Sequence, residues 1–271
     1  MQAATFAAHL LRRKPSAELW LFLGCQVFAV MVVSGTLLFT ERIERAIYHE
    51  NASLMAADLL LESSRPLNQA ALRKWRQRAA ALALVDAEAI ELDSMLFHGG
   101  QLQLTEITAA SPGYPLRGSL TVATGLGQMP GQTAVLPAAG EIWLDTRTAQ
   151  ALRAVPGDTI ELGTSKLLFT RVLHQQPGLA LPGIGLAGRA LIAMAQLEQT
   201  QLLRPGSRAN YRWLLAGDAA NVASMASWLE PMLEPQQRII SSQQGGENTA
   251  RAIQRMQGFL NLSGATSLLL A

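Results

Sequence analysis

The longest apolar stretch of the sequence runs from Leu19 to Phe39 and contains no charged residue. A helix rises about 1.5 Å per residue, so this stretch is long enough to cross a hydrocarbon core of roughly 30 Å. A second apolar run begins near Phe259 and reaches Ala271. We therefore expect a transmembrane helix at 19–40 and the start of a second one, truncated, at 259–271.

Other interpretations of these runs are a cleavable signal peptide or a buried helix of a soluble protein. A signal peptide has a shorter apolar core and a cleavage site between small residues. The stretch from 19 to 39 is too long for that, and the sequence Thr40-Glu41-Arg42 offers no such site. The shorter run after Phe259 has the length of a core helix, but its position at the end of the sequence favours a truncated second span.

Between the two runs the pattern changes to short alternating and amphipathic segments. Apolar and polar residues alternate over 90–93 and again over 101–104, with Gly99-Gly100 between them, which predicts a β-hairpin. Apolar residues at helical spacing over 72–82 predict a helix capped by Asn68. The basic residues at 73–78 then form its solvated face.

Further strands and helices follow from the same patterns. We expect strands at 57–62, 119–123, 141–144, 159–162, 166–173, 190–195, 208–215 and 238–242, and helices at 146–155 and 218–233. The Gly/Pro-rich stretch from Gly125 to Gly140 is predicted to separate two subdomains. The mixture of strands, helices and hairpin-like pairs indicates an α+β fold.

The basic cluster Arg12-Arg13-Lys14 precedes the first apolar run. By the positive-inside rule it leaves the N-terminus in the cytoplasm and the middle domain outside. The predicted organisation is a cytoplasmic amphipathic segment at 1–18, a transmembrane helix at 19–40, an extracytoplasmic domain at 41–258 and the second span from 259. Stalk helices are expected near 41–54 and 248–258.

Charge and cysteine content exclude some classes of function. A net charge of +2 over 271 residues is too small to indicate a nucleic-acid partner. The only cysteine, Cys25, lies in the first apolar run, so the outer domain has neither a disulfide nor a Cys-based metal site.

Some short segments resemble nucleotide-binding or catalytic motifs, but each of these resemblances is weak. Gly183 to Gly188 match G-x-G-x-x-G, but prolines precede the motif and a strand follows, so a loop is expected rather than a dinucleotide site. Glu88, Glu91 and Asp93 are expected on the wet side of a strand. No P-loop or nucleophile elbow occurs. The histidines stand apart from one another, at His9, His49, His98 and His174. We predict no catalytic, cofactor-binding or metal residue and no enzyme activity, although a site assembled in space leaves no local signature.

The ordered segments of the chain resemble the FtsX-like, MacB-type ABC transporter permeases, above all the large YbbP-like branch. The resemblance covers almost the whole chain. It is carried by residues 12–14, Glu18-Leu19, 41–46 (ERIERA), 56–59 (AADL), 113–118 (GYPLRG), 140–145 (GEIWLD), 156–163 (PGDTIELG), 205–208 (PGSR) and Tyr211-Arg212. These are structural turns and strands, so the specificity comes from their order.

The resemblance implies the N-terminal part of a multi-pass permease in a bacterial inner membrane, with a large periplasmic domain. It implies a partner ATPase that binds as a dimer on the cytoplasmic side, contact with membrane lipid, and motion transmitted through the stalks. It further implies export or extraction of a hydrophobic compound or lipid, and makes a periplasmic partner protein a candidate. It transfers no site residues.

Two alternatives remain open at the level of sequence. A two-span membrane sensor with an outer ligand-binding domain shows the same pattern, and so does a membrane-anchored enzyme. Further hydrophobic spans beyond Ala271 would favour the permease, whereas a signalling coiled coil and kinase motifs would favour the sensor.

Overall fold

The computed structural model describes residues 52–178, 188–204 and 206–242, together with residues 31 and 34. The chain divides into two units, 1–47 and 48–271, and nearly all of the described residues belong to the second. Residues 1–18, the stalk at 248–258, and all but two residues of the proposed spans lie outside the described part. Within that part, no helix has both the length and the apolar character needed to cross a membrane.

The described part of the second unit is built on one mixed sheet of eleven strands. The strands are β1 (Leu59–Ser63), β2 (Val85–His98), β3 (Gln101–Ala110), β4 (Leu120–Ala123), β5 (Gly131–Thr133), β6 (Glu141–Asp145), β7 (Thr159–Leu162), β8 (Ser165–Gln175), β9 (Gly188–Ala193), β10 (Asn210–Ala216) and β11 (Gln237–Ser241). The helices are α3 (Gln69–Ala81), α4 (Thr146–Leu152), α5 (Met194–Thr200), α6 (Ala219–Leu229) and the 3₁₀ turn η1 (Glu230–Met232).

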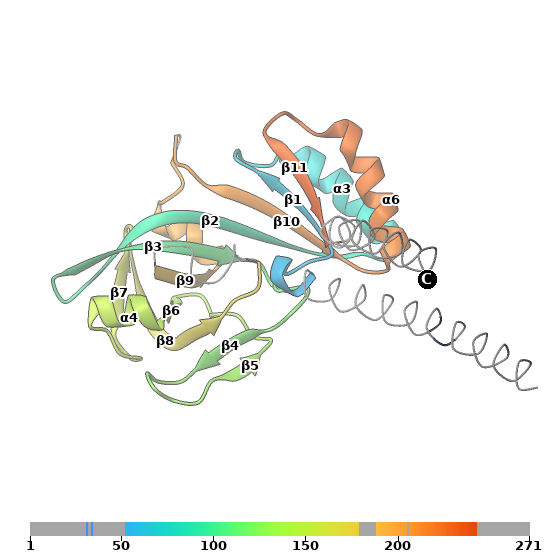
Figure 1. Ribbon diagram of the computed structural model, residues 1–271. Helices are drawn as coiled ribbons and strands as arrows, with labels where there is room; N and C mark the ends of the chain where they lie inside the picture. Colours follow the sequence, from blue (N-terminus) through green and yellow to red (C-terminus); the bar gives the residue numbers. More distant parts are fainter. Residues whose placement is uncertain (1–30, 32–33, 35–51, 179–187, 205, 243–271) are drawn as a thin grey trace, which may run out of the picture. The chain divides into compact units, whose positions relative to one another are not determined.

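Six of the strands close into a ring. The sheet order is β11-β1-β10-β2-β3-β9-β6-β8-β4-β5, and β7 pairs with both β8 and β2. The contact of β7 with β2, through Leu162 opposite Leu96, therefore closes a barrel of β2, β3, β9, β6, β8 and β7 (Figure 1). Closure gives each of these strands two neighbours and leaves no open edge within the ring.

The barrel surrounds an apolar core. Inward side chains from its strands are fully buried, among them Leu96, Ile107, Ile142, Phe169 and Ile192. Helices α4 and α5 pack on the same core through Leu152 and Leu197. The Asp145 carboxylate accepts a hydrogen bond from the Thr148 amide at 2.7 Å, which caps the N-terminus of α4.

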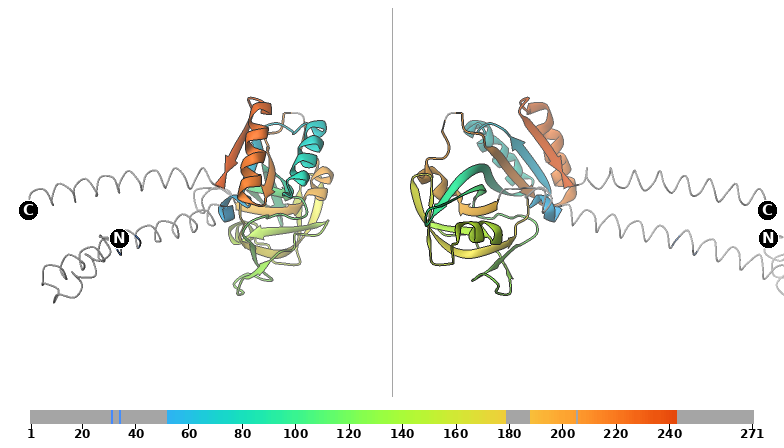
Figure 2. Two further views of the ribbon diagram at one scale, coloured as in Figure 1. Left: turned by 90° about the vertical axis from the view of Figure 1, so that its right-hand side faces the viewer. Right: turned by 60° about the vertical axis from the view of Figure 1, so that its left-hand side comes forward.

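Outside the barrel, β4 and β5 continue from β8, and strands β11, β1 and β10 join β2 in an open antiparallel sheet. Its order is β11-β1-β10-β2, and β2 is shared with the barrel because it is long enough to serve both. Helices α3 and α6 lie side by side against this sheet (Figures 1 and 2). Their buried residues join the strands in one apolar cluster, in which Trp75 stacks on Trp213 with ring centroids 5.9 Å apart.

Most predicted elements are confirmed. The hairpin is longer than expected, with Phe97 opposite Leu102 next to the Gly99-Gly100 turn. Asn68 caps α3, its side-chain oxygen accepting from the Ala70 amide at 2.9 Å. Two predicted helices end early. The helix from 146 stops at Leu152 because Arg153 adopts φ 55°, and α6 stops at Leu229, before the proline-containing 3₁₀ turn.

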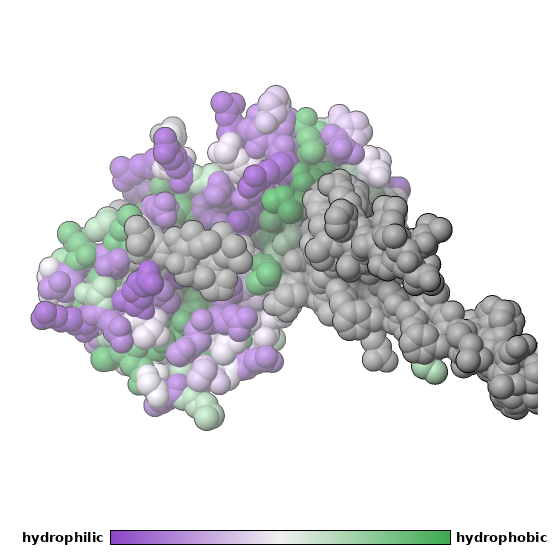
Figure 3. All heavy atoms as spheres, in the orientation of Figure 1, coloured by the Kyte–Doolittle hydropathy of each residue, from purple (hydrophilic) through white to green (hydrophobic). Residues whose placement is uncertain are grey.

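One prediction about domain organisation is wrong. The stretch from Gly125 to Gly140 does not separate subdomains, because the strands on either side of it, β4 and β6, both pair with β8. The chain instead passes between the open sheet and the barrel within β2 and again between α5 and β10. Hydrophilic residues prevail on the face of the unit shown in Figure 3, with hydrophobic ones between them.

Candidate coupling site

Asp58 stands at the residue before β1 and is fully buried. Its carboxylate accepts two hydrogen bonds from Arg117, from Nε to Oδ1 at 3.0 Å and from Nη2 to Oδ2 at 2.6 Å. Its Oδ2 also accepts from the backbone N–H of Gly217, which follows β10, at 3.0 Å. A bidentate pair of this kind fixes orientation as well as distance.

The same residue also joins the two described ends of the second unit. The backbone carbonyl of Asp58 accepts from both the N–H and the hydroxyl of Ser242, each at 3.1 Å. Ser242 directly follows β11, so the strand that enters the domain and the strand that leaves it are tied at one point. We call Asp58, Arg117, Gly217 and Ser242 the junction.

Two loops clamp the residues just before Asp58. The Gly178 amide donates to the Leu54 carbonyl at 2.7 Å, and the Arg117 amide donates to the Ala56 carbonyl at 3.0 Å. Gly118 lies against Ser53: a Cβ added to this glycine would be 2.6 Å from the hydroxyl oxygen of Ser53. Residues 53–57 are therefore held by loops that belong to the barrel side of the domain.

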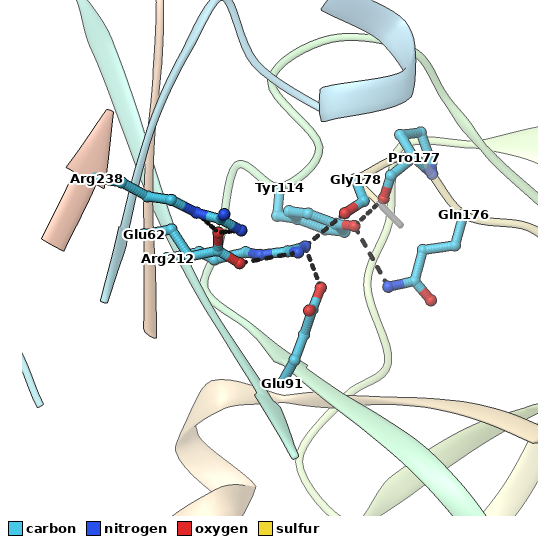
Figure 4. A network of polar contacts seen from close by, with 8 residues as sticks. All are labelled: Glu62, Glu91, Tyr114, Gln176, Pro177, Gly178, Arg212 and Arg238. Carbon is cyan, nitrogen blue, oxygen red and sulfur yellow. Dashed lines mark hydrogen bonds and ion pairs between the residues drawn. The ribbon is translucent and has the colours of Figure 1, made fainter. Parts of the chain in front are cut away.

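A second polar group, the charge row, crosses the open sheet (Figure 4). Arg238 on β11, Glu62 on β1, Arg212 on β10 and Glu91 on β2 follow one another in strand order and alternate in sign. Arg238 Nε donates to Glu62 at 2.7 Å, and Arg212 Nη2 lies 3.4 Å from the other Glu62 oxygen. Arg212 Nη1 donates to Glu91. One charge from each of four neighbouring strands thus links the whole open sheet.

The charge row also reaches the loop that follows barrel strand β8. Arg212 donates to the Gly178 carbonyl, and the buried Tyr114 hydroxyl donates to the Pro177 carbonyl. Gln176 donates to the Tyr114 hydroxyl at 3.3 Å. Burial raises the pKa of Tyr114, so it remains a neutral donor. The open sheet and the barrel are therefore connected by hydrogen bonds in addition to the shared strand β2.

Glu91, on β2, is the last member of the charge row. Burial raises its pKa to about 7, against the opposing attraction of Arg212. The prediction that Glu91 lies on the wet side of a strand is therefore wrong: it is 6% exposed and ion-paired. The reason is tertiary, since β10 pairs beside this stretch of β2 and brings in the cation of Arg212.

The neighbouring acidic residues differ from Glu91. Asp93 is exposed, as predicted. Glu88 is half-buried and pairs with Arg76 of α3. One of the basic residues at 73–78, which were predicted to form a solvated face, is therefore ion-paired. His98 is half-exposed and its Nδ1 lies 3.0 Å from the Thr159 carbonyl oxygen. The G-x-G-x-x-G stretch lies outside the described residues except for Gly188, which begins β9.

The junction and the charge row bind strands of the open sheet to one another and to loops of the barrel side. Their charged groups bind one another through fixed, charge-assisted hydrogen bonds. Among the residues that the structure describes, no group of three or more His, Cys, Asp or Glu side chains is arranged to hold a metal ion. Sequence reasoning missed both sites because Asp58 and Arg117, or Glu91 and Arg212, are far apart along the chain. The recurring segments that contain Asp58, Arg117 and Arg212 give no sign that these residues pair.

Comparison with known proteins gives one relative in sequence. No protein-family model matches the chain. The chain is 30% identical over 260 residues to the uncharacterized ABC transporter permease YbbP of Escherichia coli K12. The match covers 96% of this chain and 30% of that permease, so the chain spans less than a third of the relative's length.

Solved structures give weaker likenesses. The periplasmic region of MacB from Actinobacillus actinomycetemcomitans has a TM-score of 0.47 and 12% identity, covering 76% of this chain and 97% of that one. The extracellular domain of the transporter YknZ from Gram-positive bacteria has a TM-score of 0.45 and 9% identity, and the match covers 68% of this chain and 100% of that domain. At these TM-scores the likeness decides neither fold nor function. The sequence match by itself confirms the resemblance that the ordered segments predicted: over 96% of its length this chain is similar to an ABC transporter permease.

Proposed function

We propose that the chain is the N-terminal part of an ABC transporter permease in a bacterial inner membrane, and that residues 41–258 form its periplasmic domain. In this proposal a separate cytoplasmic ATPase dimer hydrolyses ATP, and the periplasmic domain moves to export or extract a hydrophobic compound or lipid. The match to YbbP over 96% of the chain carries the proposal.

The junction supports a route for the movement. Two stalk helices, predicted at 41–54 and 248–258, would enter and leave the domain next to Asp58 and Ser242. A displacement of either stalk would then reach β1, β10 and β11 at one hydrogen-bonded point. From there the charge row and the clamp on residues 53–57 lead to the barrel.

Two properties of the site support a non-enzymatic role for this part of the chain. The buried carboxylates Asp58, Glu62 and Glu91 each accept from an arginine, which leaves them committed to structure. The hollows beside the charge row are shallow and polar, and a pocket for a drug-sized ligand is normally concave and mostly apolar.

Purification of the tagged full-length permease from its own membranes tests the ATPase partnership. We expect an ABC ATPase to co-purify and to hydrolyse ATP, and we expect the activity to disappear when the lysine of its P-loop is replaced. A permease that purifies without any ATPase, while a kinase co-purifies, would favour the sensor.

A helix-breaking substitution tests the coupling. Spin labels at Ser224 on α6 and at Glu41, in a chain with Cys25 replaced by Ala, report the distance between domain and membrane. We expect ATP to change this distance in the parent chain and in Gln254→Ala, but not in Gln254→Pro, since a broken helix transmits no displacement. The same distance change in the proline variant would contradict the stalk mechanism.

A further inference from the structure

The outer face of the β2–β3 hairpin carries large apolar side chains that are open to solvent. Met95 lies opposite Leu104 and Phe97 lies opposite Leu102, so all four project from the same face. Their exposed fractions are 46%, 49%, 38% and 64%, respectively. We call these four residues the tip patch.

The fold itself does not require the tip patch. The inner face of the same hairpin supplies the barrel core, with Leu92, Leu96, Thr105 and Ile107 buried. In an antiparallel pair with one buried face, the other face is ordinarily polar. The tip patch is therefore an excess of apolar surface at a place where the core is already filled.

Acidic residues adjoin the tip patch on the same face. The next cross-strand pair along the hairpin is Asp93 opposite Glu106, and like charges placed opposite each other are destabilising. Neither carboxylate has an ion-pair partner within the described part of the chain. With Glu91 they border an open hollow of about 230 Å³, and among the described residues that line it Arg208 is the one basic residue.

We propose that this face binds an amphipathic helix of a partner protein. Apolar residues of that helix cover the tip patch, and its Lys or Arg residues face Asp93 and Glu106. Along a strand that rises about 3.4 Å per residue, Phe97 and Asp93 lie roughly 14 Å apart. A helix covers this distance in about nine residues, so the cations follow the apolar residues by two to three turns.

The charge of the surface distinguishes this occupant from two others. A membrane surface with anionic lipids would be repelled by the carboxylates that adjoin the tip patch. A second copy of this chain would have to offer a basic helix with exposed apolar residues. Helix α3 carries exposed Arg73 and Lys74, but its apolar residues Leu72 and Trp75 are already buried against the open sheet.

A synthetic helix tests the proposal on the full 271-residue chain in zwitterionic lipid nanodiscs. The probe is a fluorescent 14-residue peptide with Leu at positions spaced by three and four and Lys in its last turns. A matched peptide carries Glu in place of each Lys, and empty nanodiscs give the background. We expect fluorescence anisotropy to show at least tenfold tighter binding of the Leu/Lys peptide.

Variants of the chain locate the binding. Phe97→Ser combined with Leu102→Ser should weaken binding of the Leu/Lys peptide at least tenfold. Asp93→Asn combined with Glu106→Gln should weaken it about threefold to tenfold and remove most of its salt dependence. Met129→Ser replaces an apolar side chain that is 94% exposed elsewhere, on the loop between β4 and β5, and should leave binding unchanged.

Three results would overturn the proposal. The first is equal affinity for the Leu/Lys and Leu/Glu peptides. The second is undiminished binding of the Leu/Lys peptide by the Phe97→Ser, Leu102→Ser variant when that variant keeps the thermal midpoint of the parent chain. The third is tighter binding of anionic vesicles than of the peptide, lost in the same variant, which would assign the tip patch to a membrane.

Discussion

The open sheet and the barrel differ in the kind of polar side chain that they bury. The buried carboxylates among the described residues are Asp58, Glu62 and Glu91, which lie on or beside the strands of the open sheet. The buried polar side chains that serve the barrel and its helices are uncharged, such as Thr105 and Gln196. The open-sheet half thus contains a network of buried charges besides its apolar cluster, whereas the barrel half has no buried carboxylate among the described residues.

This difference matches what each half is attached to. The barrel closes on itself, so its strands satisfy one another's backbone hydrogen bonds. The apolar contacts in its core are not directional. The open sheet meets both ends of the described chain at Asp58 and meets the barrel loop at Gly178. Charge-assisted hydrogen bonds are directional, so they suit the half that has to keep several attachments in fixed register.

The largest expected effect is in the barrel core. Phe169→Ala removes a fully buried ring and should lower the free energy of unfolding by about 4 kcal/mol. Urea unfolding of the full chain, followed by tryptophan fluorescence, measures this loss. The neighbouring Leu168 is 45% exposed, and Leu168→Ala should change stability by less than about 0.5 kcal/mol. Equal losses for the two variants would show that the barrel core is not a closed apolar unit.

The second effect is at the junction. Asp58→Ala leaves Arg117 and the partly buried Gly217 amide without their acceptor, and should cost about 3 kcal/mol, the low end for a broken buried pair because the Arg117 side chain is 40% exposed. Hydrogen exchange should accelerate first at β1 and β11, the strands tied at Asp58. Acceleration confined to the barrel would contradict the role of the junction.

The third effect is a pH dependence of stability that arises from Glu91 in the open sheet. Unfolded Glu91 loses its proton near its ordinary pKa of 4.5, whereas the folded chain retains the proton up to about pH 7. The folded state therefore binds more protons between these values, and stability falls as pH rises through this range. The loss between pH 5 and 8 should be about 2 kcal/mol larger in the parent chain than in Glu91→Gln. Identical pH profiles would show that Glu91 does not titrate in this range.

The smallest effect concerns the surface of the open sheet. Arg76 pairs with Asp86 at 2.9 Å and with Glu88, but its side chain is 41% exposed. Arg76→Gln should cost no more than about 1 kcal/mol, and less at high salt. Arg73→Gln, on the solvated face of the same helix, is the matched control and should have no measurable effect. A loss above about 2 kcal/mol would place Arg76 in the network of buried charges.

The local elements were predictable because their signals are local. Alternation around Gly99-Gly100 predicted the hairpin, and Asn68 before an apolar stretch at helical spacing predicted α3 and its cap. The short helix α5 was missed, because Ala190 to Ala195 was assigned to one strand, whereas β9 ends at Ala193 and the chain turns into a helix at Met194. Periodicity over so few residues does not distinguish the two.

By itself the sequence determined the hairpin, most strands, the Asn68 cap of α3 and the resemblance to ABC transporter permeases, since each depends on neighbouring residues or on their order. Only the tertiary structure decided that β7 closes a barrel, that Glu91 is buried and that Asp58 joins both described ends of the domain. These features depend on contacts between residues that are 59 to 184 positions apart. Such contacts are selected by burial and charge pairing across the whole fold, and no local pattern records them.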